Sequence, residues 1–156
     1  MADTDANSGR RVLVQKLYLR DASVEVPGGP GIFEGEWRPQ IDVDLNFRVG
    51  DLGEQRHEVS VSVTVTAKRD DKTAYIVEVD QAGVFLVSGF DDTDEHQRVL
   101  GAYCPSVLFP YVRETVGDLV QRAGFPHFLL QPMNFDALFE QHRRSQDADA
   151  AQPATH

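Results

Sequence analysis

IDVDLNFRVGDLGEQRHEVSVSVTVTA, residues 41–67, alternates apolar and polar side chains on both sides of a short polar segment. Every odd position of residues 41–49 is apolar, and the odd positions of residues 58–67 hold four valines and an alanine. Alternation with period two and β-branched residues predicts two strands, each with a packed face and a polar face, as in antiparallel sheets. The segment VGDLGEQRH between them is typical of a hairpin connection.

Two further segments extend this sheet in both directions along the chain. Residues 73–88 follow a second hairpin segment, KRDDK, and place three large apolar side chains at alternate positions from Tyr75. Gly83 within this strand predicts a bulge or a bend. Residues 12–26 are apolar at odd positions first and at even positions later, so one extra residue near Arg20 would explain the change as a β-bulge.

The bulge has a consequence for the polar face of the sheet. Beyond it, Asp21, Ser23 and Glu25 lie on one side of their strand, and Glu78 lies on the polar side of the strand at 73–88. A sheet of one layer would combine Asp21, Glu25 and Glu78 into a flat acidic surface. The simpler interpretation, a solvated polar face, remains open from the residues alone.

Residues 27–39, PGGPGIFEGEWRP, have the composition of an irregular loop but contain Phe33 and Trp37, the only tryptophan. Loops are normally polar and exposed, so large aromatic side chains on one need an explanation. They either hold the loop against the core or line an apolar groove, and the sequence leaves both possibilities open.

The C-terminal half is helical by pattern. The acidic segment at residues 91–96 lacks the spacing of a calcium loop and favours the start of a short helix. An apolar stripe predicts a helix from Pro105 to Gly124, with proline at its start and glycine beyond its end. Asn134 is a suitable N-cap for a last helix, FDALFEQHRR.

Length and charge limit the class of protein. The chain has 156 residues, one cysteine and a net charge of −10, which suits one domain without internal disulfides. We expect disordered ends at residues 1–11 and 143–156, and a single domain at residues 12–142. Both ends sum to zero charge, so the domain carries the excess acid, which disfavours nucleic acid. Neither a signal peptide nor an apolar membrane segment is recognisable, and we expect a cytoplasmic protein.

No catalytic constellation is recognisable in the sequence. It lacks a phosphate-binding glycine loop, a nucleophile elbow and a zinc-protease motif. The histidines are far apart in sequence, and Cys104 is best interpreted as a buried structural thiol. We therefore expect a protein that is not an enzyme and binds neither a metal nor another cofactor. A small α+β enzyme with a dispersed site and an oligomeric adaptor are the alternatives.

Six sequence blocks resemble the SecB family of bacterial protein-export chaperones. They are YLRDASVEVP at 18–27, FEGEWRP at 33–39, VTVTA at 63–67, LGAYCP at 100–105, LFPY at 108–111 and PMNFDALF at 132–139. The resemblance implies an α+β fold, a four-stranded antiparallel sheet with a long amphipathic helix and a C-terminal helix. It also implies an ATP-independent holdase that binds unfolded precursors and delivers them to SecA, the motor ATPase of general secretion.

The resemblance assigns residues to each role. The precursor groove would be lined by Phe33, Trp37, Val43, Leu45, Leu130, Phe135 and Phe139. The motor would bind Asp21, Glu25 and Glu78 on the acidic sheet face. The family assembles as a homotetramer, a dimer of dimers, and the stripe with Leu108, Val112, Val116 and Leu119 would form its interface. A weaker tail contact with the motor and a groove shortened by the polar residues 140–142 are expected departures.

Overall fold

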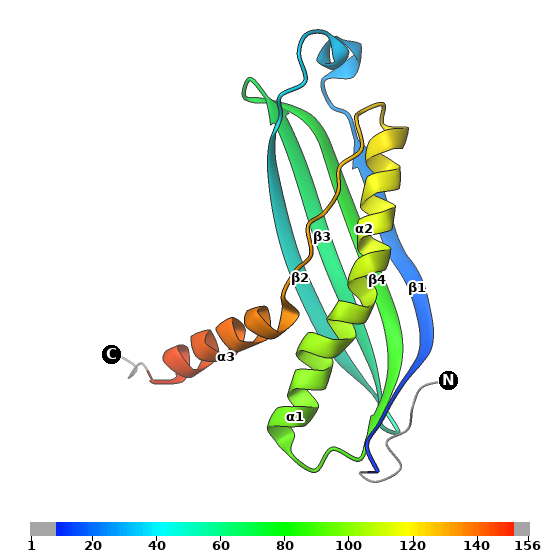
Figure 1. Cartoon of the computed structure of the whole chain (residues 1–156), viewed down its shortest axis with the longest axis vertical. Helices are drawn as coiled ribbons and strands as arrows, with labels where there is room; N and C mark the ends of the chain where they lie inside the picture. Colours follow the sequence, from blue (N-terminus) through cyan, green and yellow to red (C-terminus); the bar gives the residue numbers. More distant parts are fainter. Residues whose placement is uncertain (1–8, 152–156) are drawn as a thin grey trace.

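The computed structural model describes residues 9–151 and contains one four-stranded antiparallel sheet with helices against one face (Figure 1). The strands lie in the order β1-β4-β3-β2, so β1 and β2 are the edges. Their bounds are β1 (Arg11–Glu25), β2 (Gln40–Gly53), β3 (Arg56–Arg69) and β4 (Lys72–Ser88). The expected α+β architecture is confirmed.

Tight turns join β2, β3 and β4 into a meander. Glu54 and Gln55 connect β2 to β3, and Asp70 and Asp71 connect β3 to β4. All four residues have positive φ, between 51° and 64°. Positive φ at both central residues is what a type I′ hairpin turn requires, and it matches the twist of the flanking strands. The two hairpins expected from the sequence are therefore confirmed.

β1 pairs with β4 in an interrupted register. One shift lies between Leu19 and Asp21, which confirms the bulge expected at Arg20, and a second lies between Val14 and Lys16. Gly83 of β4 is not a bulge, because neither of its pairings shifts there. A Cβ at Gly83 would lie 3.1 Å from the side chains of both Leu17 and Leu108. This glycine therefore allows the helix layer to approach the strand closely.

The helices follow the sheet in sequence. They are α1 (Thr93–Arg98), the π-helical turn η2 (Val99–Tyr103), α2 (Cys104–Arg122) and α3 (Phe135–Ala151), after a 3₁₀ turn η1 (Gly29–Phe33) in the β1–β2 loop. The Asp92 side chain accepts hydrogen bonds from two backbone N–H groups of α1, so the acidic segment is a helix cap. The amide of Ala137 donates to the Asn134 side chain, which confirms the expected cap of α3.

α3 is longer than the sequence indicated. It continues to Ala151 and so includes residues 143–151, for which we expected disorder. Short polar and alanine residues in this stretch have adequate helix propensity, and Asp94 pairs with Arg143 at 3.3 Å. The disorder expected for the N-terminus falls mostly on residues 1–8, outside the described residues.

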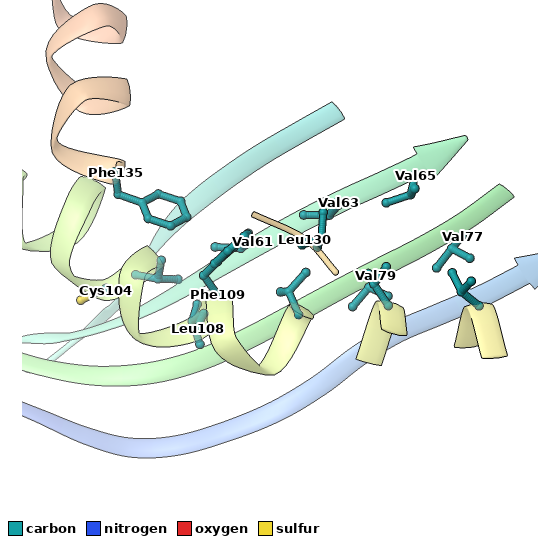
Figure 2. Packing of buried hydrophobic residues seen from close by; sticks show 14 of the residues in the cluster. Val61, Val63, Val65, Val77, Val79, Cys104, Leu108, Phe109, Leu130 and Phe135 are labelled. Carbon is teal, nitrogen blue, oxygen red and sulfur yellow. The ribbon is translucent and has the colours of Figure 1, made fainter. Parts of the chain in front are cut away.

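The core lies between α2 and the packed faces of β3 and β4 (Figure 2). Valines 59, 61, 63 and 65 of β3 are at most 1% exposed. Leu108, Val112 and Val116 of α2 are fully buried against them, and Leu119 is half-buried. This corrects the expected oligomer interface, because the apolar stripe of α2 covers the chain's own sheet and three of its four residues have no surface left for a second chain.

Candidate functional site

Four aromatic rings hold the β1–β2 loop at one end of the sheet. Phe33 lies 5.0 Å from Phe125, and Trp37 lies 4.9 Å from the same ring and 6.3 Å from Tyr75. Tyr75 and Phe125 are buried, whereas Trp37 is half-buried and Phe33 is 49% exposed. The loop aromatics therefore both hold the loop against the core and leave apolar surface in solvent.

β2 carries a row of apolar side chains that the helices cover only partly. Val43, Leu45 and Phe47 are half-buried, in contrast to the fully buried valines of neighbouring β3. A cleft of about 530 Å³ lies between this strand and α3. Its lining includes Leu45, Phe47 and Val49 of β2 and Leu138, Gln141 and His142 of α3. One wall is apolar and the other is mixed, which suits a polypeptide segment better than a compact polar ligand.

α3 is attached to the rest of the molecule through η2. The Phe139 ring lies where a Cβ of Gly101 would be, 2.6 Å from the ideal position of that atom. Arg98 lies over the same ring at 5.1 Å and pairs with Glu140 and Asp136. The guanidinium lowers the pKa of the Glu140 carboxyl through their hydrogen bond. The helix projects away from the sheet beyond this attachment (Figure 1).

The expected groove residues fall into two groups. Phe33, Trp37, Val43 and Leu45 retain exposed surface, whereas Leu130, Phe135 and Phe139 are 2%, 5% and 8% exposed. The Nε–H of Arg113 donates to the carbonyl of Leu130 at 2.9 Å, and Phe109 stacks edge to face with Phe135. These three residues support the groove wall from inside the core and present little surface to a ligand.

Sequence reasoning missed the side chains that open onto the cleft. Phe47 and Val49 belong to the alternating row that predicted β2, so the pattern already contained this signal. Leu138 occurs in the helix motif PMNFDALF, between Phe135 and Phe139, which were the predicted groove residues. The polar residues Gln141 and His142, expected to shorten the groove, line the cleft instead of closing it.

A larger cleft, of about 1180 Å³, lies beside the start of α2. Apolar side chains of Val99, Ala102, Met133 and Phe135 line it together with the half-exposed Tyr103. Arg10, Arg11, Arg98, Glu95 and Asp136 add charge to the lining. No sequence pattern predicts this cleft, because it is formed by segments that lie up to more than a hundred residues apart.

A network of ion pairs occupies the centre of the polar face of the sheet. Arg20, at the bulge, donates to Glu58 at 2.9 Å and lies 3.9 Å from Asp80, and Arg48 of β2 lies 3.7 Å from Asp80. Tyr18 donates to Glu58, and this hydrogen bond raises the pKa of the Tyr18 hydroxyl. Charges on all four strands are thus largely neutralised in this central region.

The acidic residues expected on the same face lie beside that region. Ser23 pairs with Glu78 in register, so Asp21 and Glu25 are the diagonal neighbours of Glu78 on one face. All three are exposed and have no ion-pair partner among residues 9–151. The sheet therefore presents three carboxylates in a flat area beyond the Arg20 network, as the strand parity predicted.

Within the described part of the chain, no group of three or more histidine, cysteine or acidic residues could hold a metal ion. Burial raises the pKa of the Cys104 thiol to about 12, so the thiol is a poor nucleophile. Among the described helices, none is long and apolar enough to cross a membrane.

The chain is thus an α+β protein with open apolar clefts on one side of its sheet and an acidic patch on the other. Its sequence matches the family model described as "Preprotein translocase subunit SecB" over residues 5–146. The chain belongs to the SecB family of protein-export chaperones.

Relatives in other bacteria agree with this assignment. The protein-export protein SecB of Methylococcus capsulatus is 46% identical over 155 residues, which cover 99% of both chains. That of Alkalilimnicola ehrlichii is 55% identical over 128 residues, 82% of this chain and 68% of the relative. A Mycobacterium tuberculosis SecB-like chaperone, solved with an antitoxin peptide, has the same fold, with a TM-score of 0.58 and 18% identity over 79% of this chain and 91% of that one.

Proposed function

We propose that this chain is an ATP-independent holdase of the cytoplasm that binds unfolded precursors and delivers them to the SecA motor of the general secretion pathway. The observation that carries the proposal is the half-exposed apolar row of β2 facing α3 across an open cleft. The M. tuberculosis SecB-like chaperone was solved with a bound peptide, and this supports a peptide ligand for the related fold here.

Apolar burial explains how such a site holds chains of unrelated sequence. Each large apolar side chain of a client that leaves water contributes about 1.5–3 kcal/mol, without directional requirements. Phe33 and Trp37 extend the apolar surface from β2 to the loop, and aromatic side chains offer a large contact area with few rotamers to fix. Clients would bind through several such contacts, and release would follow from transfer to the motor without nucleotide hydrolysis by this chain.

Motor binding belongs to the opposite face. Asp21, Glu25 and Glu78 form an exposed acidic area that favours a basic partner surface by electrostatic complementarity. Because the cleft and the acidic area lie on different faces, one chain can hold a client while it contacts the motor. A tetramer would use residues on the outer side of η2 and α2, where Tyr103 and Tyr111 are 52% and 44% exposed.

The test is suppression of aggregation of several unrelated denatured proteins. Wild type should suppress it, and the double variant Phe47→Ser with Leu138→Ser should lose most of the effect, because both cleft walls then lose their apolar contacts. Leu52→Ser is the matched control, since Leu52 is 44% exposed in the β2–β3 hairpin and outside the cleft. Binding of a single folded protein, with no effect on denatured chains, would identify an adaptor and refute the proposal.

A further inference from the structure

Two imidazoles connect α1 to the sheet. His57 lies on the packed face of β3, and its ring meets that of His96 of α1 edge to face, with centroids 5.4 Å apart. α1 contributes no buried residue to the described core, so little apolar contact holds it in place. The pair lines a cleft of about 330 Å³ between the β2–β3 hairpin and α1. The contact is therefore one of the few that join α1 to the sheet.

The surroundings favour neutral rings. The Nδ1 atom of His57 is buried and has no hydrogen-bond partner within residues 9–151. Burial lowers the pKa of His57, the charge of His96 lowers it further, and Asp51 acts in the opposite direction. Other ionisable groups near the pair are Glu54 of the turn, Arg56 of β3, and Glu95 of α1, which pairs with Arg10 at 2.6 Å.

Protonation would oppose this arrangement. Burial lowers the pKa of His57 below its ordinary value of about 6.5, so the docked state of α1 favours the neutral ring. The docked state therefore keeps its full stability above about pH 6.5 and loses stability as the pH falls below that value. A positive charge on His57 would lie against the His96 ring, at 5.4 Å between the ring centroids. Asp51, which is opposite His57 in the strand register, can offset part of that charge.

We propose that His57 and His96 form an acid-sensitive latch that releases α1 from the sheet and loosens α3 with it. α1 continues into η2, on which Phe139 of α3 is seated over Gly101. Asp94 of α1 also pairs with Arg143 of α3. Movement of α1 therefore disturbs these two attachments of α3, the helix that forms one wall of the client cleft. The effect on clients rests on the proposed function, whereas the latch itself does not.

Hydrogen exchange of the full chain at about pH 7.5 and about pH 5.5 tests the latch, with rates corrected for intrinsic exchange. In wild type, residues 93–103 should lose protection at the lower pH, by up to about tenfold, while β3 and β4 remain protected. The double variant His57→Gln with His96→Gln should abolish this difference, and His96→Gln alone should reduce it. His127→Gln is the matched control, because His127 is exposed on the α2–α3 connection, away from the cleft.

The outcomes separate the latch from the proposed function. Equal protection of residues 93–103 at both pH values in wild type, or an unchanged pH response in the double variant, overturns the latch. Client binding at about pH 7.5 that weakens at the lower pH in wild type but not in the double variant supports the link to α3. Client binding that stays constant while α1 opens overturns that link. Absence of client binding at either pH refutes the proposed function and leaves the exchange result on the latch valid.

Discussion

β1 and β2 both lie at an edge of the sheet, but β1 breaks register twice, while β2 pairs with β3 without interruption from Gln40 to Asp51. Bulges twist an edge away from further pairing, whereas a regular edge stays open to contact. The bulge at Arg20 also turns Asp21 and Glu25 to the polar face, and the regularity of β2 keeps its apolar row beside α3. The same sheet thus provides an acidic surface at one edge and an apolar one at the other.

The largest expected effect comes from detaching α3 from η2. This change should remove only the client cleft between β2 and α3. Gly101→Leu places a side chain where the Phe139 ring lies, so α3 can no longer dock on η2. We expect client affinity, measured by fluorescence anisotropy with a denatured peptide, to fall by more than about tenfold, a loss of about 1.4 kcal/mol or more.

The acidic surface of β1 provides the contrast in that experiment. Motor affinity of the Gly101→Leu variant should stay within about twofold of wild type, because the polar face is untouched. Gly31→Ala is the control, since a Cβ there meets no atom within 4 Å. Equal losses at both sites would show that the two edges are not independent.

A smaller effect is expected from neutralising the β1 surface. Asp21→Asn, Glu25→Gln and Glu78→Gln together should lower motor affinity about tenfold at low salt and less at high salt, because exposed charges are screened. Aggregation suppression should not change. Glu114→Gln removes an exposed carboxylate from α2 instead and should leave motor affinity as it is. A loss of client holding in the triple variant would contradict the separation of the faces.

The smallest effect is expected from a change in the Arg20 ion-pair network, which lies beside the acidic surface. Arg20→Met removes the partner of Glu58 and a neighbour of Asp80, and should lower the free energy of unfolding by only about 0.2–1 kcal/mol per lost exposed pair. Calorimetry should therefore show a decrease in Tm of a few degrees at most. Motor affinity should rise, because the Glu58 carboxylate loses its arginine partner and the polar face becomes more acidic beside Asp21. An affinity below that of wild type would mean that Arg20 itself contacts the motor.

The sequence predicted the elements that depend on local pattern. Alternation identified β2 and β3, the change of parity located the bulge at Arg20, and Asn134 marked the start of α3. The sequence pattern could not predict which surface each apolar face packs against. The stripe through Leu108 and Val116 packs on the chain's own sheet, although the same amphipathicity suits a second chain equally well.

The contact between Phe139 of α3 and Gly101 of η2 could not be predicted from the sequence for a related reason. Gly101 and Phe139 are 38 positions apart, counted as 139 − 101, and only the folded chain shows that one lacks a side chain where the other places its ring. The groove prediction thus included Phe139 as a lining residue, whereas the ring is 8% exposed. Side-chain type predicted the apolar character of the site, and packing decided which atoms remain accessible.

The order of the strands also bears on how the chain folds. β2, β3 and β4 are joined by two-residue turns, while β1 pairs with β4 across the whole of β2 and β3. Because closing a long loop costs more entropy than closing a tight hairpin, the meander is expected to form first and β1 to join it last. The three carboxylates of the acidic surface come together only at that final step. An incompletely folded copy would therefore lack the surface that we propose for the motor.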